Sequence, residues 1–177
     1  MGLRYENLDP ETRRFMLEEI EMDAASDRIH LSAYLTQRAQ GDWPDWLREA
    51  AQSGTDDTLA ARLRMGTALN RTTMRRTRGG YTQAKVPYNA AEVLAEGEFN
   101  RFYVRGLSRR ALSEGIPRLE VYRAKAVMQP RPESQRLIGL LVDPDILLLD
   151  VRRSTGVETA LGVPPGPGSG ITVRIPR

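Results

Sequence analysis

The 177-residue sequence contains no cysteine and only one histidine, His30. The absence of cysteine excludes disulfides, thiolate metal sites and cysteine nucleophiles. A catalytic triad or a histidine-based metal site would have to use His30, and such metal sites need further ligands that are missing here. We therefore expect His30 to face solvent or to be satisfied by hydrogen bonds, and we expect neither a metal nor a cofactor.

Long apolar runs are also missing. The longest, Ile146–Leu149, falls far short of the roughly 20 residues that span a bilayer. The polar, acidic N-terminus has no apolar stretch of signal-peptide length. We expect a chain with no membrane segment, which is not secreted through a signal peptide and works in the cytoplasm or within a virion-like particle. A hydrophobic content of 40% and a charged content of 28% are typical of a folded globular protein.

Acidic residues are absent from Thr58–Ala91, and this stretch begins the basic part of a sequence whose charge is unevenly distributed. Met1–Asp57 holds 13 acids and 6 bases, a net charge of −7, whereas Thr58–Arg177 holds 10 acids and 20 bases, a net charge of +10. A surface of one sign attracts its opposite over roughly 10 Å at physiological salt. The division therefore predicts a partner of opposite charge. The acid-free stretch carries Arg62, Arg64, Arg71, Arg75, Arg76, Arg78 and Lys85.

Caps and apolar periodicity predict the helices. Asp9-Pro10 and Asp143-Pro144 each combine an N-cap residue with proline at the first helical position. Apolar residues at helical spacing then predict helices over 10–26, 42–52, 55–65, 90–113 and 144–153. Inside the longest helix, Gly97 and Gly106 each cost about 1 kcal/mol relative to alanine, so they indicate close packing, a bend or a break.

Alternating polar and apolar residues predict the strands. They lie over 29–35, 119–127 and 171–175, with a weaker candidate at 81–86. The prolines in 128–133 favour an extended or turned segment, and the glycines and prolines of 162–170 favour a loop. This combination predicts one α+β domain over residues 1–177, with a long central helix and a small sheet. Residues 1–57 form its acidic helical part, 58–88 a basic loop or arm, and 89–177 the helix-strand core with a Pro/Gly-rich loop and a C-terminal strand.

The basic segment has three possible environments. Its arginines are interleaved with threonine and asparagine, which supply the donors that contact phosphates. Alternatively, the segment lies against the acidic N-terminal region of its own chain or of a neighbouring subunit, or it is a solvated loop. The long helix adds Arg101, Arg105 and Arg109, which fall four residues apart on one face. They predict either a basic ridge or an ordinary solvated face.

Catalytic patterns are weak. Glu120, Lys125 and Asp143 loosely resemble the acids and lysine of metal-dependent nucleases. However, Glu120 and Lys125 are five positions apart, which places them on opposite faces of a strand. The acids of the first helix could gather around Mg²⁺, although an acid-rich helix face is more often simply solvated. The loop at 162–170 lacks the lysine and the following helix of a phosphate-binding loop.

The sequence favours a non-enzymatic structural or assembly subunit, such as a viral or virion-like component, that forms a homo- or hetero-oligomer. Its basic segment would face DNA, RNA or an acidic neighbouring subunit. The second hypothesis is a small nucleic-acid-binding regulatory protein, and the third is a metal-dependent nuclease.

Overall fold

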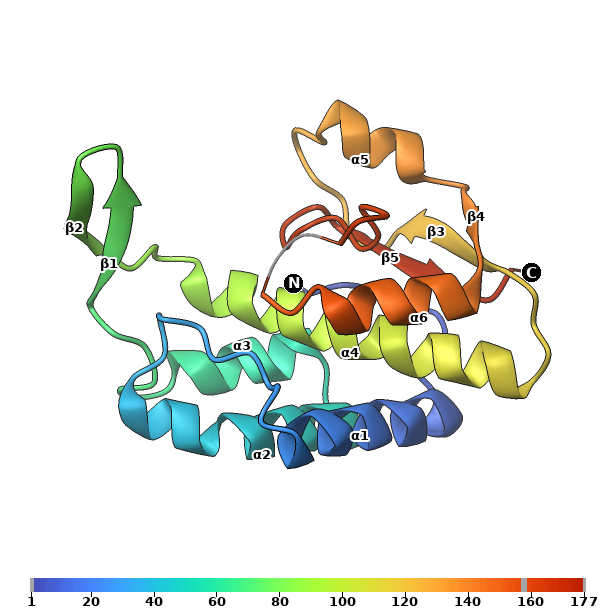
Figure 1. Cartoon of the computed structure of the whole chain (residues 1–177), viewed down its shortest axis with the longest axis horizontal. Helices are drawn as coiled ribbons and strands as arrows, with labels where there is room; N and C mark the ends of the chain where they lie inside the picture. The colour runs from blue at the N-terminus through green and yellow to red at the C-terminus, as the bar shows by residue number, and fades with distance from the viewer. Residues whose placement is uncertain (1, 157–158, 177) are drawn as a thin grey trace.

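The long helix α4 (Ala90–Ser113) runs through the middle of the molecule, and the other elements pack around it (Figure 1). The computed structural model describes residues 2–156 and 159–176. In α4, 17 of the 24 residues are buried, which is unusual for a helix with so many charged side chains. This helix therefore links the helical side of the domain to its small sheet.

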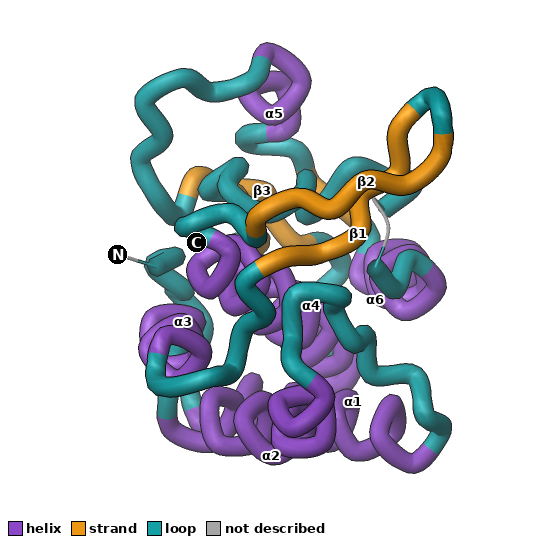
Figure 2. The backbone as a smooth tube through the Cα atoms, turned by 90° about the vertical axis from the view of Figure 1, so that its left-hand side faces the viewer, coloured by secondary structure: helices purple, strands orange, loops and turns teal. Residues whose placement is uncertain are grey.

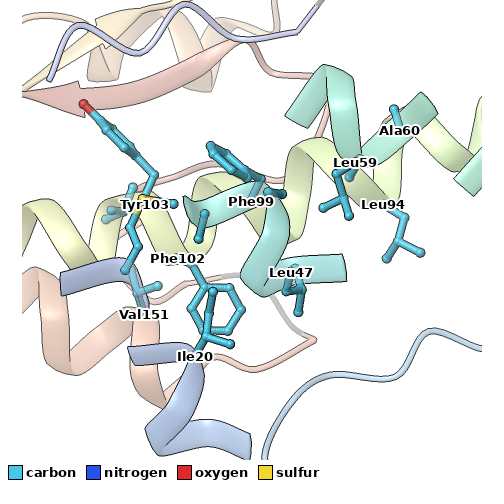
Figure 3. Packing of buried hydrophobic residues seen from close by; sticks show 14 of the residues in the cluster. Ile20, Leu47, Leu59, Ala60, Leu94, Phe99, Phe102, Tyr103 and Val151 are labelled. Atoms are coloured by element: carbon cyan, nitrogen blue, oxygen red, sulfur yellow. The ribbon is translucent and has the colours of Figure 1, made fainter. Parts of the chain in front are cut away.

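Helices cover α4 on two sides. The helices α1 (Pro10–Ala25), α2 (Gln37–Ser53) and α3 (Asp56–Arg64) form one layer, and α6 (Pro144–Arg153) packs along α4 on another side (Figure 1). Figure 3 shows apolar side chains from all five helices meeting in the core between them. Burial of such side chains, at about 25 cal/mol per Å² of apolar surface, is the main force that holds these helices together.

The cap-and-proline pairs start their helices as predicted. The Asp9 carboxylate accepts a hydrogen bond from the Thr12 backbone N–H at 3.1 Å, and Asp143 does the same for the first turn of α6. Helix α2 begins earlier than predicted, at Gln37, because Thr36 acts as its N-cap and the helix continues through Pro44. A proline inside a pattern was therefore a poor guide to that helix start.

A three-stranded antiparallel sheet, in the order β4-β3-β5, lies on the opposite side of α4 from α2 (Figure 1). Its strands are β3 (Leu119–Arg123), β4 (Leu141–Val142) and β5 (Ile171–Arg174). Leu119 and Val121 are buried against the core, as the alternation predicted, but the strand ends at Arg123 rather than at Val127. Residues 128–131 have no regular secondary structure, as predicted, but the short helix α5 (Pro132–Leu137) takes in the last two residues of the predicted segment.

A separate β-hairpin forms the outer part of the predicted basic loop or arm. Strands β1 (Thr72–Thr77) and β2 (Gly80–Lys85) pair with each other alone (Figure 2). Strand β2 confirms the weaker candidate, whereas β1 was not expected. The predicted strand at 29–35 is wrong: this segment makes only one isolated bridge, Leu35 to Leu69, because no neighbouring strand lies beside it among the described residues.

The chain is thus a single α+β domain in which six helices and two small antiparallel sheets are described. In residues 2–156 and 159–176, no helix has the length and apolar character needed to cross a membrane.

The N-terminal segment is held by a buried carboxylate, Asp56, at the start of α3. Its Oδ2 accepts a hydrogen bond from the Leu3 backbone N–H at 2.9 Å, and the residue is 3% exposed. Burial raises the pKa of Asp56 to about 6, and the nearby charges of Asp57 and Glu96 act in the same direction against the Leu3 hydrogen bond. In the unfolded chain the pKa of this carboxyl is about 3.9, so folding disfavours its charged form.

This shift makes a prediction about pH. Because the folded-state pKa of Asp56 is raised, the protonated carboxyl favours the folded state. Its contribution to the free energy of unfolding is fully present below about pH 4 and is lost as the pH rises through about 6. Asp56→Asn is therefore expected to raise the free energy of unfolding at about pH 7.5 by about 1–2 kcal/mol relative to wild type, and to leave it nearly unchanged at about pH 4. Urea unfolding at both pH values measures this difference; an equal effect at the two would contradict the assignment.

Candidate nucleic-acid interface

The hairpin, with the residues that flank it, forms a basic arm, defined here as residues 71–85. It carries five cationic side chains and no acid, and all five are exposed: Arg71, Arg75, Arg76, Arg78 and Lys85. The arm projects from the helical body in both Figure 1 and Figure 2. Charge of one sign is therefore concentrated on a narrow, two-stranded element.

The strand register distributes these cations over both faces of the arm. Arg76 lies opposite Tyr81, on the same face as the Thr72–Lys85 pair, and Arg75 lies opposite Thr82 on the other face. A hydrogen bond of 2.9 Å from the Gln83 Nε2 amide to the Thr72 Oγ1 hydroxyl fixes the diagonal of the first face. Arg78 sits in the two-residue loop at the tip. A molecule gripped by the arm would thus meet positive charge from either side.

Hydrogen bonds anchor the base of the arm to the helical body. The Asn70 side-chain amide donates to the carbonyl oxygens of Ala33 and Leu35, at 3.2 and 2.9 Å, and the Asn70 backbone N–H donates to Tyr34 at 2.8 Å. The Val86 N–H closes the base through the Arg71 carbonyl at 3.0 Å. The arm is therefore fixed at its base and extends away from the helical body (Figure 1).

None of the five cationic side chains of the arm forms an ion pair or a hydrogen bond with another residue in the described part of the chain. Their charge is therefore not compensated within the described molecule. Two other predicted site residues, Arg62 and Arg64, are also exposed but lie on α3: the Arg62 guanidinium stands 5.6 Å from the Trp46 ring, and Arg64 pairs with Glu92 at 3.0 Å. They belong to the body rather than to the arm.

The basic ridge predicted for α4 is wrong, and so is the alternative of a solvated face. Arg105 is fully buried and Arg101 is 7% exposed, while Arg109 is half-buried. Arg105 donates through Nε to Glu19 at 2.8 Å and through Nη2 to Asp23 at 3.0 Å. These arginines face the acids of α1 and not solvent, because α1 packs along the same side of α4.

Buried arginines also explain the chemistry of Glu19. Burial acts to raise the pKa of this carboxylate, but hydrogen bonds from Arg152 and the charge and hydrogen bonds of Arg105 outweigh it, so its pKa lies below the usual range. Further acids of the N-terminal part pair in the same way: Glu18 with Arg109, Asp9 with Arg110 and Glu6 with Arg174. Much of the charge complementarity between the two parts of the sequence is therefore met inside one chain.

The nuclease-like residues do not come together. Glu120 pairs with Arg174 at 3.0 Å, Lys125 pairs with Glu96 at 3.0 Å, and Asp143 caps α6 and pairs with Arg118. Within residues 2–156 and 159–176, no three His, Cys, Asp or Glu side chains gather in a group that could hold a metal ion. The partly buried His30 lines a pocket beside α4.

Two apolar side chains on the arm were not predicted from the sequence. Met74 is 61% exposed and Tyr81 is 71% exposed, and both lie on the face that carries Arg76. Alternation within 72–77 could have indicated β1, but threonine and arginine gave no apolar period to follow.

Comparison of the chain with protein-family models, with curated proteins and with solved structures gave no match.

Proposed function

We propose that this protein is a non-enzymatic nucleic-acid-binding protein that grips the phosphate backbone of a duplex with its basic arm. The observation that carries the proposal is the set of five exposed cations, unpaired within the described residues, on a projecting two-stranded ribbon. Phosphate contacts from arginine and lysine supply most of the affinity in such complexes and release condensed counterions. The basic segment is thus the binding element, and the buried α4 arginines Arg101 and Arg105 do not belong to it.

The shape of the arm suits a duplex groove. The major groove of B-form DNA is about 12 Å wide and admits a two-stranded β-ribbon. Cations on both faces could then reach the phosphates of both flanking strands, with Arg78 deepest at the tip. The exposed Tyr81 and Met74 supply apolar contact on one face, whereas a single-strand stacking platform would need more aromatic side chains than the arm has.

Internal neutralisation favours nucleic acid over an acidic neighbouring copy. A second copy could offer the acids of α1, but each of them already pairs with an arginine of its own chain: Glu11, Glu18, Glu19, Glu21 and Asp23. Exchanging those partners would break buried ion pairs at Glu19 and Asp23, which is costly. A phosphate backbone meets no such competition.

Binding is expected to depend on the arm alone. Replacing Arg71, Arg75, Arg76 and Arg78 with alanine should weaken the affinity for a duplex of about 20 base pairs about 100-fold at about 0.1 M salt, equally for unrelated sequences. The slope of log K against log salt should fall by about 0.9 for each phosphate that the variant no longer neutralises. Fluorescence anisotropy over a salt series measures both quantities.

A matched control separates the arm from general charge. The alanine variant of Arg38, Arg131, Arg136 and Arg153 loses the same formal charge from exposed positions on the body. It should keep wild-type affinity within about threefold, and both variants should keep the wild-type free energy of unfolding. Equal reductions of affinity in the two variants, or duplex binding that is absent in the wild type at micromolar protein, would contradict the proposal.

A further inference from the structure

A pocket of about 670 Å³ lies between the first half of α4 and the Pro/Gly-rich loop at 162–170. This volume falls in the range of small-molecule sites. Its apolar walls come from Val93 and Leu94 of α4 and from three prolines of the loop, Pro164, Pro165 and Pro167. Such walls favour a flat, apolar ligand body.

Hydrogen bonds hold the loop against α4, so this wall of the pocket is fixed in position. The Gly168 backbone N–H donates to Glu96 Oε1 at 2.7 Å, and Lys125 Nζ donates to Glu96 Oε2 at 3.0 Å. The Ser169 hydroxyl donates to the Pro165 carbonyl at 3.0 Å. Both carboxylate oxygens of Glu96 are therefore engaged, and this residue serves to hold the loop.

Two other charged residues of the pocket, Glu98 and Arg101, are not saturated. Each is 7% exposed, and the Arg101 Nη1 atom lies 3.7 Å from Glu98 Oε2, too far for a hydrogen bond. Glu98 Oε2 and the Nε and Nη1 atoms of Arg101 are buried without a hydrogen-bond partner among the described residues. Burying charged groups without hydrogen-bond partners costs free energy, and a ligand that supplies such partners would offset this cost.

The neighbouring Arg105 differs from Arg101 in its hydrogen bonding. It lies one turn further along α4 and shares Asp23 with Arg101, yet its Nε and both of its terminal nitrogens are bonded. Arg101 makes one hydrogen bond, from Nη2 to Asp23 at 3.2 Å. The fold therefore saturates the arginine in the core and leaves donors on the arginine that lines the pocket.

We propose that this pocket binds a small, uncharged, planar heterocycle through a lactam edge, as guanine presents. The Glu98 carboxylate only accepts hydrogen bonds and the Arg101 guanidinium only donates them. A lactam edge offers an N–H group to the first and an adjacent carbonyl oxygen to the second. The opposite charges of the two residues offset each other, which suits a neutral ligand, and the proline and leucine walls would cover the ring faces. This site is independent of the basic arm.

The single histidine provides a direct reporter. Because His30 is the single histidine of the sequence, its imidazole resonances are unique in the proton NMR spectrum. Because it lines the same pocket, these resonances should shift when a ligand binds there. Titration with guanosine should shift them, and adenosine should bind at least about 10-fold more weakly because its edge reverses donor and acceptor. 1-Methylguanosine, which lacks the N1–H donor, should also bind at least about 10-fold more weakly.

Variants then test the residues. Glu98→Gln should weaken guanosine binding at least about 10-fold, whereas Glu114→Gln, an equal charge change on the exposed end of α4, should leave it unchanged. The proposal is overturned if millimolar guanosine leaves the His30 resonances in place, if adenosine or 1-methylguanosine binds as well as guanosine, or if Glu98→Gln binds normally. The ligand comparison needs no variant, so it decides the matter even if Glu98→Gln fails to fold.

Discussion

Arg105→Met is expected to lower the free energy of unfolding by about 3–5 kcal/mol, because it removes a fully buried counterion from the buried carboxylates of Glu19 and Asp23. Arg105 is 0% exposed, and its guanidinium bonds Glu19 and Asp23 of α1. Methionine keeps much of the side-chain volume, so the decrease reports charge and hydrogen bonding rather than a cavity. Urea unfolding monitored by circular dichroism measures the change.

Arg109→Met is the matched control for this prediction. Arg109 lies one turn beyond Arg105 and pairs with Glu18 at 2.7 Å and at the longer distance of 3.5 Å with Glu19, but its side chain is 29% exposed. Solvent screens such a pair, so the expected decrease is below about 1 kcal/mol. Similar decreases in the two variants would show that the cluster at Arg105 contributes no more than a surface pair.

A triple variant checks that the Arg105 cluster acts as a unit. Glu19→Gln and Asp23→Asn remove the two stranded charges that Arg105→Met leaves behind. The triple variant should therefore be destabilised by less than the sum of the three single variants. Additive effects would mean that each side chain acts through other contacts, such as Arg152 at Glu19.

Local signals explain how much of this fold could be predicted from the sequence. The starts of α1 and α6 depend on Asp9-Pro10 and Asp143-Pro144, whose capping bonds span three residues or fewer. A cap, a proline and an apolar period are all visible within one window. The central helix and the α+β class followed from the same kind of signal.

Distant partners explain most of what the sequence could not predict. The segment at 29–35 has strand-like alternation but only one bridge, to Leu69, because a strand is defined by a neighbour. Arg101 and Arg105 resemble a solvated face in sequence because the acid that they share, Asp23, lies 78 and 82 residues away along the chain. Charge patterning along one helix cannot show which element will pack on it.

The two candidate sites also differ in how far the sequence could predict them. The five cations of the arm were predictable as a basic segment from composition alone, but their display on a hairpin depends on the pairing of β1 with β2. The pocket was not predictable, since Glu98 and Arg101 meet His30 and the prolines of 162–170 only through the tertiary fold.

Gly106→Ala is expected to destabilise the protein by about 3 kcal/mol, because α1 and α4 touch through their backbones at this position. A Cβ atom at Gly106 would lie 2.6 Å from Met16 Cγ, 2.9 Å from the Met16 backbone nitrogen and 3.0 Å from the Thr12 carbonyl oxygen. A flexible side chain could move away, but two backbone atoms of a buried helix cannot. The two helices would have to separate along the contact that also positions Arg105 against Glu19.

Gly97→Ala, nine residues earlier in the same helix, is expected to have the opposite sign. Its Cβ would meet Pro167 Cβ at 3.5 Å, an ordinary van der Waals contact. Alanine is the better helix former by about 0.8–1 kcal/mol, so this variant should gain up to that amount. Urea unfolding of both variants in parallel separates packing from propensity, since helix propensity alone would stabilise both. A gain at Gly106 comparable to that at Gly97 would show that α1 and α4 are not in backbone contact, and the burial of Arg105 between them would have to be revised.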